Sequence, residues 1–340
     1  MQKLLSIVCI VLIITSCISS KNKKNTEDSV ALEYAKTITA EELKKMLYTY
    51  ASDEYEGRQT GEIGQKKAIE FIKNEYMENE IPSPIAINDY FQYIPESFFN
   101  GHAKASENVL AYIKGSDIPD EVLVISAHLD HIGITNDGEI NNGADDDGSG
   151  TVAILEIAEA FKTAKKNGHG PKRSILFLHV TGEEIGLYGS RYYTDVDPIF
   201  PLENTIANLN IDMIGRVDKK HEKDPNYLYL IGSDKLSKEL HDISEEVNKK
   251  YIDMKFDYTY NAENDPNRFY YRSDHYNFAK NNIPVIFYFN GTHEDYHRPS
   301  DTPEKINYEL LETRARLIFH TAWELANRSE RVKLDEEKSN

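Results

Sequence analysis

The chain has 340 residues, of which 40% are hydrophobic, and it carries a formal net charge of −18 at pH 7. A surface with this excess of carboxylates repels nucleic acid and anionic lipid, and no dense basic run reverses the effect locally, so nucleic-acid partners are excluded. The length and the apolar content are sufficient for one large domain with an ordinary hydrophobic core.

The first residues have the pattern of an export signal. Lys3 precedes an apolar run at 4–14, and the letters ITSC that end at Cys17 resemble a loose lipobox. The run is too short to span a bilayer. We therefore predict a signal peptide over 1–16, lipidation of Cys17, and export to a bacterial membrane, on its periplasmic side or at the cell surface, with the lipid as the only membrane contact. A plain secretory signal with an incidental cysteine is the alternative.

Polar segments flank the predicted domain. We predict a tether over 17–39, a single domain over 40–328 and a disordered tail over 329–340, because the two ends are charged and poor in apolar residues. Cys9 lies inside the predicted leader, so the exported domain can form no disulfide.

Helical and strand patterns alternate along the domain. Apolar residues at three- and four-residue spacing predict helices at 43–50, 68–76, 154–161, 235–251 and 309–326. Short continuous apolar runs predict buried strands at 122–125, 175–180, 206–211, 228–231 and 284–289. This order predicts an α/β fold, a three-layer α/β/α sandwich around a mostly parallel, mixed central sheet. The loops 81–106 and 255–272 are expected to shape the substrate pocket.

Polar side chains follow three of the predicted strands. His128 follows the first strand, Glu183 and Glu184 follow the second, and Asp212 follows the third. The carboxyl ends of parallel strands form the functional crevice of open α/β sheets. The sequence therefore predicts that these side chains meet at one edge.

The loop GADDDGSG at 143–150 contains three adjacent aspartates. Such carboxylates repel one another, so a cation is expected to hold them together. Zinc accepts imidazole nitrogen and carboxylate oxygen, and two zincs can share a bridging carboxylate. The available donors are His128, one or more of Asp145, Asp146 and Asp147, Glu183 or Glu184, Asp212, and His293 or His297.

Five motifs in order carry a family resemblance. They are His128-Leu129-Asp130, GADDDGSG at 143–150, TGEEIGLYGS at 181–190, NIDM at 210–213 and HRPSDT at 297–302. Together they resemble the dizinc exopeptidases related to bacterial leucyl aminopeptidase, aminopeptidase Y and glutamate carboxypeptidase, over roughly residues 40–326. The resemblance implies the zinc peptidase fold and two Zn²⁺ per chain.

The resemblance also implies a role for each site residue. Asp146 would bridge the metals, His128 and Asp212 would complete one zinc, and Glu184 and His297 the other. The spacing His-x-x-x-Asp-Thr favours His297 over His293.

Two carboxylates would act beside the metals. Glu183 would be the general base, and Asp130 would lie behind His128, since a ligating imidazole usually donates its other N–H to a carboxylate.

The segment FYYRSDH at 269–275 resembles the family segment that places a tyrosine over the substrate carbonyl three residues before Ser-Asp-His. This assigns Tyr270 as an oxyanion donor, with Ser273 and Asp274 lining the pocket. The segment departs from the family, because Tyr271 is adjacent and Arg272 stands where a cysteine can occur. His131, His179 and His275 are predicted to be structural.

The implied function is a zinc-dependent aminopeptidase that acts on small peptides or protein N-termini. A hydroxide that bridges two zincs would attack, with Glu183 as general base. A glutaminyl cyclase, which works with one zinc, and a non-catalytic binding relative are the alternatives. Asp147 after the predicted bridge favours two metals, and the complete ligand set argues against a non-catalytic role. Carboxypeptidase or dipeptidase action, the side-chain preference and the oligomeric state stay open.

Overall fold

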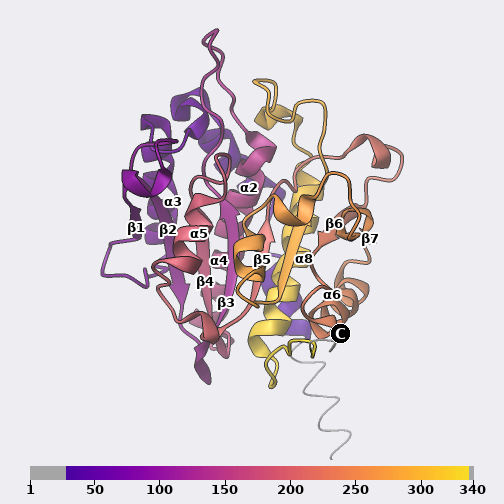
Figure 1. Cartoon of the computed structure of the whole chain (residues 1–340). Coiled ribbons are helices and arrows are strands. Elements are labelled where there is room, and N and C mark those ends of the chain that lie inside the picture. Colours follow the sequence, from indigo (N-terminus) through magenta and orange to yellow (C-terminus); the bar gives the residue numbers. More distant parts are fainter. Residues whose placement is uncertain (1–27, 337–340) are drawn as a thin grey trace, which may run out of the picture.

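An eight-stranded mixed sheet forms the centre of the part of the chain that the computed structural model describes, residues 28–336 (Figure 1). The strand order is β1-β2-β4-β3-β5-β8-β6-β7. The strands are β1 Phe91–Ile94, β2 Ser106–Ile113, β3 Ile118–His128, β4 Arg173–Val180, β5 Thr205–Ile211, β6 Tyr227–Ile231, β7 Lys255–Asp257 and β8 Val285–Phe289.

Four adjacent strands are parallel. β4 and β5 both pair with β3, and β8 pairs with β5, all in parallel register. β1 and β2 extend the sheet with antiparallel pairs, and β6 is antiparallel to β8. The predicted mixed, mostly parallel sheet is therefore confirmed. Three strands escaped the pattern analysis. β1 and β7 are three or four residues long and only partly buried, whereas β2 is eight residues long and mostly buried, and its apolar run was overlooked.

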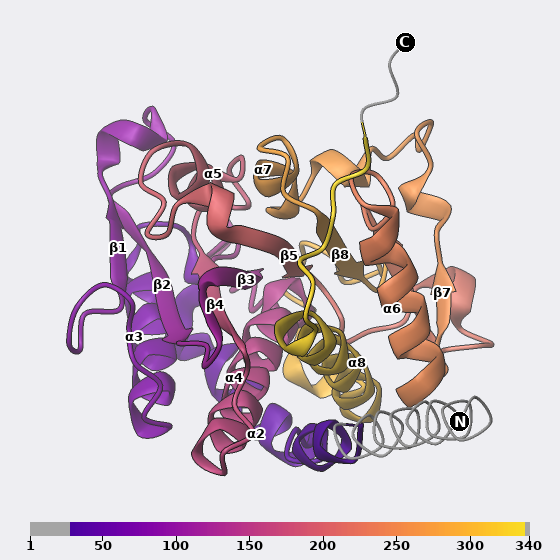
Figure 2. The ribbon, with the colours of Figure 1, turned by 90° about the horizontal axis from the view of Figure 1, so that it is seen from below.

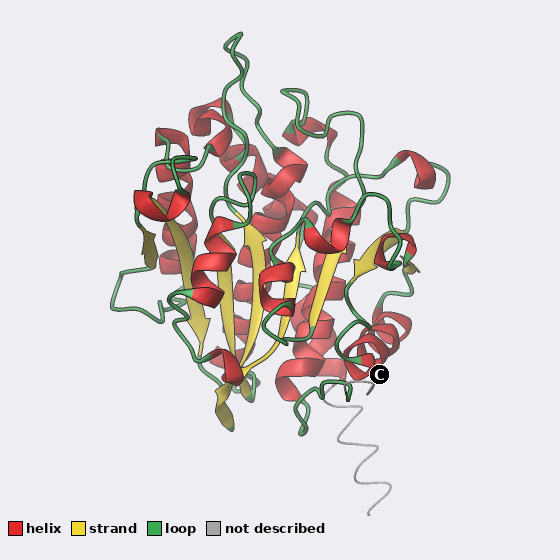
Figure 3. Cartoon of the chain, in the orientation of Figure 1, coloured by secondary structure: helices red, strands yellow, loops and turns green. Residues whose placement is uncertain are grey.

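Helices cover both faces of the sheet (Figures 2 and 3). Helices α5 and α7 lie on one face, and α2, α3, α4, α6 and α8 lie on the other (Figure 2). The helices are α2 Ala40–Tyr50, α3 Ile63–Glu78, α4 Gly150–Lys166, α5 Tyr188–Asp195, α6 Lys238–Tyr251, α7 His275–Ala279 and α8 Tyr308–Asn327.

The side chains of β3 alternate between two hydrophobic cores. Leu123 and Ile125 join the core shared with α4 and α8, whereas Val122 and Val124 join the core that contains residues of α5 and α7. Successive side chains of a strand point to opposite faces, so both faces must be apolar for the strand to be buried. This explains the continuous apolar run at 122–125.

The domain begins earlier than the predicted boundary at residue 40. Residues 28–35 are helical, and Ala31, Tyr34 and Ile38 are buried in the main core. Tyr34 stacks on Trp323 of α8 with ring centroids 6.0 Å apart. The described part of the predicted tether therefore belongs to the folded domain. The predicted signal peptide and Cys17 lie outside the described residues, so lipidation stays a prediction.

The predicted disordered tail is also partly ordered. Val332 is buried in the core, and the guanidinium of Arg331 donates a hydrogen bond to the carbonyl of Thr205 at 2.8 Å. The charged composition of the tail concealed this, since one apolar side chain and main-chain contacts are enough to attach it. Between residues 28 and 336, none of the helices combines the length and apolar character needed to cross a membrane.

Candidate metal centre

The predicted site residues meet beyond the carboxyl ends of the parallel strands. His128 is the last residue of β3, Glu183 and Glu184 follow β4, and Asp212 follows β5. His297 lies in the segment after β8. The sheet therefore delivers to one place side chains that lie far apart in the sequence, as the topology rule predicts.

Main-chain contacts distinguish the three adjacent aspartates. Asp147 Oδ1 accepts hydrogen bonds from the amides of Gly150 and Met213, each at 3.0 Å. Asp145 Oδ1 accepts a hydrogen bond from the amide of Gly215 at 2.6 Å. These two carboxylates therefore hold the loop in shape, and Asp146 is the one left for the site.

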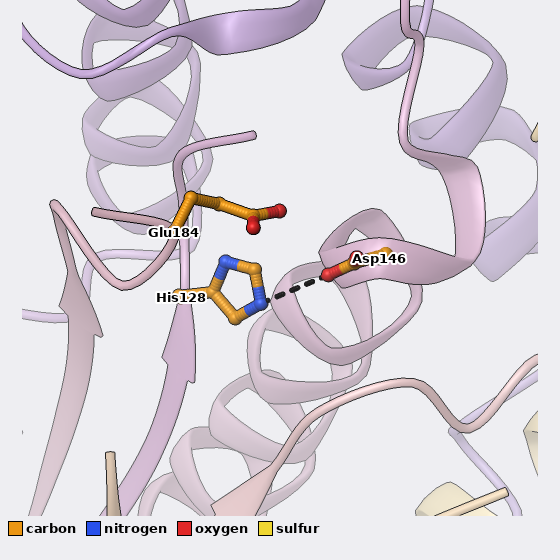
Figure 4. A group of neighbouring side chains, drawn as sticks. All are labelled: His128, Asp146 and Glu184. Carbon is orange, nitrogen blue, oxygen red and sulfur yellow. Dashed lines mark ion pairs between the residues drawn. The ribbon is translucent and has the colours of Figure 1, made fainter. Parts of the chain in front are cut away.

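Asp146 lies between two sets of donors. Its Oδ1 is 3.1 Å from His128 Nε2, which in turn lies 3.7 Å from Asp212 Oδ1. Its Oδ2 is 3.1 Å from His297 Nε2, which is also 3.1 Å from Glu184 Oε2. Figure 4 shows His128, Asp146 and Glu184 pointing toward one another. Asp146 thus presents one oxygen to each donor set, which is the arrangement of a bridging carboxylate.

Buried polar atoms of the candidate metal centre lack a hydrogen-bond partner of good geometry. Among them are Nε2 of His128 and Oδ2 of Asp146. Buried polar atoms without partners are rare in proteins, and these two belong to residues whose donor atoms converge. Imidazole nitrogen and carboxylate oxygen are ligands of zinc, so the residues present fit this metal.

His131 is a member of the site that the sequence analysis treated as structural. Its Nδ1 donates a hydrogen bond to Glu184 Oε1 at 2.7 Å and lies 3.8 Å from Asp146 Oδ2. The side chain therefore orients Glu184. Its position three residues after His128 was the available signal, but a histidine after a strand has no specific meaning without the fold.

Asp130 acts differently from the prediction. Nδ1 of His128 lies 3.0 Å from the main-chain carbonyl of Asp130, while the carboxylate oxygen is 3.9 Å away. The carboxylate instead accepts hydrogen bonds from Thr60 Oγ1 at 2.7 Å and from the amide of Glu183 at 3.2 Å. The main chain thus orients the imidazole, and the carboxylate positions the segment of the predicted general base.

The electrostatics of the centre follow from burial and close charge. Burial raises the pKa of Glu183 well above its usual range, although the nearby His128 opposes the shift. Burial alone would lower the pKa of His128, but the close carboxylates of Asp146 and Asp212 raise it well above its usual range. A cation would favour the ionised state of the carboxylates gathered here.

Ser273 and Asp274 lie behind the site and do not line its pocket. Ser273 Oγ donates a hydrogen bond to Asp212 Oδ2 at 2.6 Å and accepts one from Asn210 at 2.8 Å. Asp274 is fully buried and accepts a hydrogen bond from Ser190, and burial raises its pKa to about 7. Both residues support Asp212 and the surrounding loops, so the expectation that they face the pocket is corrected.

Tyr270 is also absent from the pocket lining. It packs between Tyr271, Tyr276 and His275 and borders a separate surface cavity. The site pocket is lined by Asp146, Glu183, Glu184, Asp212, Met213, Phe269, Arg272, Phe287, Phe289 and Tyr296. Only the second of the two loops expected to shape the pocket contributes to it among the described residues. The residue spacing did not reveal which side chains of the segment point inward.

The remaining histidines agree with the sequence interpretation. His293 pairs with Asp145 at 3.2 Å and leaves the site to His297. His179 is buried against the hydroxyl of Tyr76 at 2.7 Å, and burial lowers its pKa to about 3. His275 is buried and stacks on Phe287.

Comparison with known proteins places this geometry in a family. Residues 108–322 match the model of Peptidase family M28, and the chain belongs to this family. The chain is 28% identical over 249 residues to aminopeptidase Y of Saccharomyces cerevisiae, and this alignment covers 70% of the chain and 42% of that protein. It is 27% identical over 240 residues to leucine aminopeptidase 2 of Trichophyton rubrum, covering 64% and 44%. The chain spans about half the length of the curated relatives it matches.

Solved structures share the fold. The LapA aminopeptidase of Legionella pneumophila superposes with a TM-score of 0.69 at 24% identity, over 89% of this chain and 76% of that chain. A zinc aminopeptidase from Bacillus subtilis superposes with a TM-score of 0.63 at 16% identity, over 88% and 98%.

Proposed function

We propose that the protein is a zinc-dependent aminopeptidase with two Zn²⁺ per chain, which removes N-terminal residues from peptides. The observation that carries the proposal is the position of Asp146 between two donor sets. His128 and Asp212 would hold one metal, and Glu184 and His297 the other. Two metals that share a carboxylate are typical of hydrolytic sites in which one water is activated and one carbonyl is polarised.

Zinc bound at these ligands would supply electrostatic stabilisation of the charge that develops on the scissile carbonyl. Glu183 lines the same pocket and is not part of either donor set. We infer that its carboxylate takes a proton from the attacking water and returns it to the leaving amine. Glu183 is half-buried in this pocket, and its partial shielding from water strengthens electrostatic interactions with a substrate.

Metal content and cleavage specificity test the proposal together. Protein purified without chelator is expected to contain near two zincs per chain and to hydrolyse peptides with a free N-terminus, while N-acetylated copies of the same peptides stay intact. One zinc per chain together with cyclisation of N-terminal glutamine would establish the cyclase alternative. Cleavage of the acetylated peptides from the other end would establish a carboxypeptidase.

We also propose that the enzyme is exported and held at a bacterial membrane by a lipid on Cys17. The support is the sequence alone: an apolar leader and a loose lipobox. Wild-type protein is expected to partition into detergent after expression in bacteria, and Cys17→Ser into the aqueous phase. Equal partitioning of the two would rule out the anchor.

A further inference from the structure

The lining of the site pocket combines apolar side chains with a single basic side chain. Met213, Phe269, Phe287 and Phe289 supply the apolar surface, and Arg272 is the only basic residue of the lining within residues 28–336. The lining therefore places a positive group, apolar side chains and Glu183 around one pocket.

Arg272 has no anionic partner in the described chain. No ion pair or side-chain hydrogen bond engages its guanidinium, which is exposed and lies 4.9 Å from the centre of the Phe269 ring. The other arginine near the site differs, because Arg216 pairs with Asp295 at 2.9 Å. Contact with an aromatic face orients a guanidinium while leaving its N–H groups free.

The carboxylates of the pocket do not need Arg272 for charge balance. Asp146, Glu184 and Asp212 are the proposed ligands of two divalent cations, and Glu183 is the proposed base. A planar guanidinium that is free of internal partners matches a carboxylate with two parallel hydrogen bonds. A substrate carboxylate could therefore occupy these free N–H groups without competing with a carboxylate of the described chain.

We propose that Arg272 binds a carboxylate of the peptide substrate and makes the enzyme selective for peptides that carry one beside the scissile bond. This inference rests on the proposed aminopeptidase function. The carboxylate has two possible sources. One is the side chain of an N-terminal Asp or Glu, and the other is the free C-terminus of a dipeptide.

Two substrate pairs separate these sources in the zinc-loaded, full-length protein. The first pair is the p-nitroanilides of glutamate and glutamine, and the second is Leu-Ala and its C-terminal amide. We expect the wild type to favour the acidic member of one pair by at least about tenfold in kcat/KM, because an unpaired charged group in a binding site penalises the neutral analogue. The pair that responds identifies the source.

Arg272→Gln should abolish that preference through a fall in kcat/KM for the acidic member that is at least about tenfold larger than the fall for the neutral member. If the carboxylate comes from the N-terminal side chain, Arg272→Glu should cleave the p-nitroanilide of lysine faster than that of glutamate. Arg268→Gln is the matched control, because Arg268 is also exposed and lies 4.9 Å from an aromatic ring, but borders the other cavity. Arg268→Gln should leave the ratio of kcat/KM values within both substrate pairs unchanged.

Three results would overturn the inference. They are no preference in either pair, an equal loss for Arg268→Gln, and a uniform fall in kcat for acidic and neutral substrates. The last would mean that Arg272 stabilises the reacting carbonyl instead. If the protein hydrolyses none of these substrates, calorimetric binding of Glu-Ala, Gln-Ala and Gln-Ala amide to the zinc-loaded Glu183→Gln protein decides the question separately. Tighter binding of Glu-Ala than of Gln-Ala, or of Gln-Ala than of its amide, that is lost in Glu183→Gln/Arg272→Gln supports the inference, and equal binding of all three contradicts it.

Discussion

At the scale of single residues, neighbours of the same type have different roles. Asp145, Asp146 and Asp147 share one charge and one loop, yet only Asp146 lacks main-chain hydrogen bonds to its carboxylate. Glu183 and Glu184 diverge in the same way, because His131 and His297 contact Glu184. The contacts that a side chain makes, and not its type, decide which carboxylate is a candidate ligand.

Glu183→Gln tests the proton transfer at this scale. The amide cannot accept a proton from water, so we expect kcat to fall by at least about 10² while zinc stays bound. Steady-state kinetics and metal analysis of the same preparation check this. Retention of wild-type turnover would remove Glu183 as the base. Asp146→Ala is the contrasting variant, because it should lose metal and activity together.

Glu156 provides a pH-dependent effect away from the metal centre. It is buried on α4, and burial, with Glu42 and Glu159 nearby, raises its pKa from 4.5 to about 8. The folded state therefore keeps a proton that the unfolded state releases between these two pKa values, so this group lowers stability as pH rises through that window.

Glu156→Gln should remove the penalty and keep an acceptor for the amide of Thr39, which now bonds to Glu156 at 3.3 Å. We expect a larger gain in Tm at about pH 8 than at about pH 5. Thermal unfolding at both pH values measures it, with the exposed Glu41→Gln on α2 as control. An equal gain at both pH values would show that the carboxyl titrates normally.

At the scale of elements, the site depends on how loops are held beyond the strands. Gly143 opens the aspartate loop with a φ of +55°, and a Cβ there would lie 2.5 Å from the ring of His131. Arg58, from the segment Asp53–Arg58, is buried and donates hydrogen bonds to the carbonyls of Asn142 at 2.7 Å, Gly143 at 2.8 Å and Leu129 at 3.2 Å. One side chain thus joins the loop of Asp146 to the end of β3.

Arg58→Met should leave these carbonyls without donors and lower the free energy of unfolding by about 2–4 kcal/mol. We also expect weaker zinc binding, because the two joined segments carry His128 and Asp146. Denaturant unfolding and zinc titration test both effects. Arg173→Met is the matched control, since Arg173 is equally buried but donates to the carbonyls of Leu325 and Ser329, away from the site. Equal loss of zinc affinity in both variants would contradict a local role for Arg58.

At the scale of the whole molecule, the proposed ligands come from segments between residues 128 and 297, so the site exists only when the sheet is folded. Metal that binds the native state alone stabilises it by mass action. The two hydrophobic cores on either side of the sheet fix the strands, and the strands fix the ligands.

Removal of zinc should therefore lower Tm. The free energy of unfolding should fall by about 2.7 kcal/mol if free zinc was about 100 times Kd before its removal. Calorimetry before and after dialysis against chelator measures it, and added zinc should restore the original value. Asp146→Ala should show little change on chelation. An unchanged Tm in the wild type would mean that metal binding is too weak to couple to folding.

The sequence by itself determined the layered fold and the parallel centre of the sheet, and it predicted the candidate ligands that the structure brings together around Asp146. It could do so because strand periodicity and strand ends are local patterns, and because five motifs occur in one order. It missed His131 as a contact of Glu184, and it assigned Tyr270 to a pocket that Phe269 and Arg272 line instead. Only the tertiary structure decided these points, because the direction of a loop side chain and the burial of a terminal segment depend on packing between residues far apart in sequence.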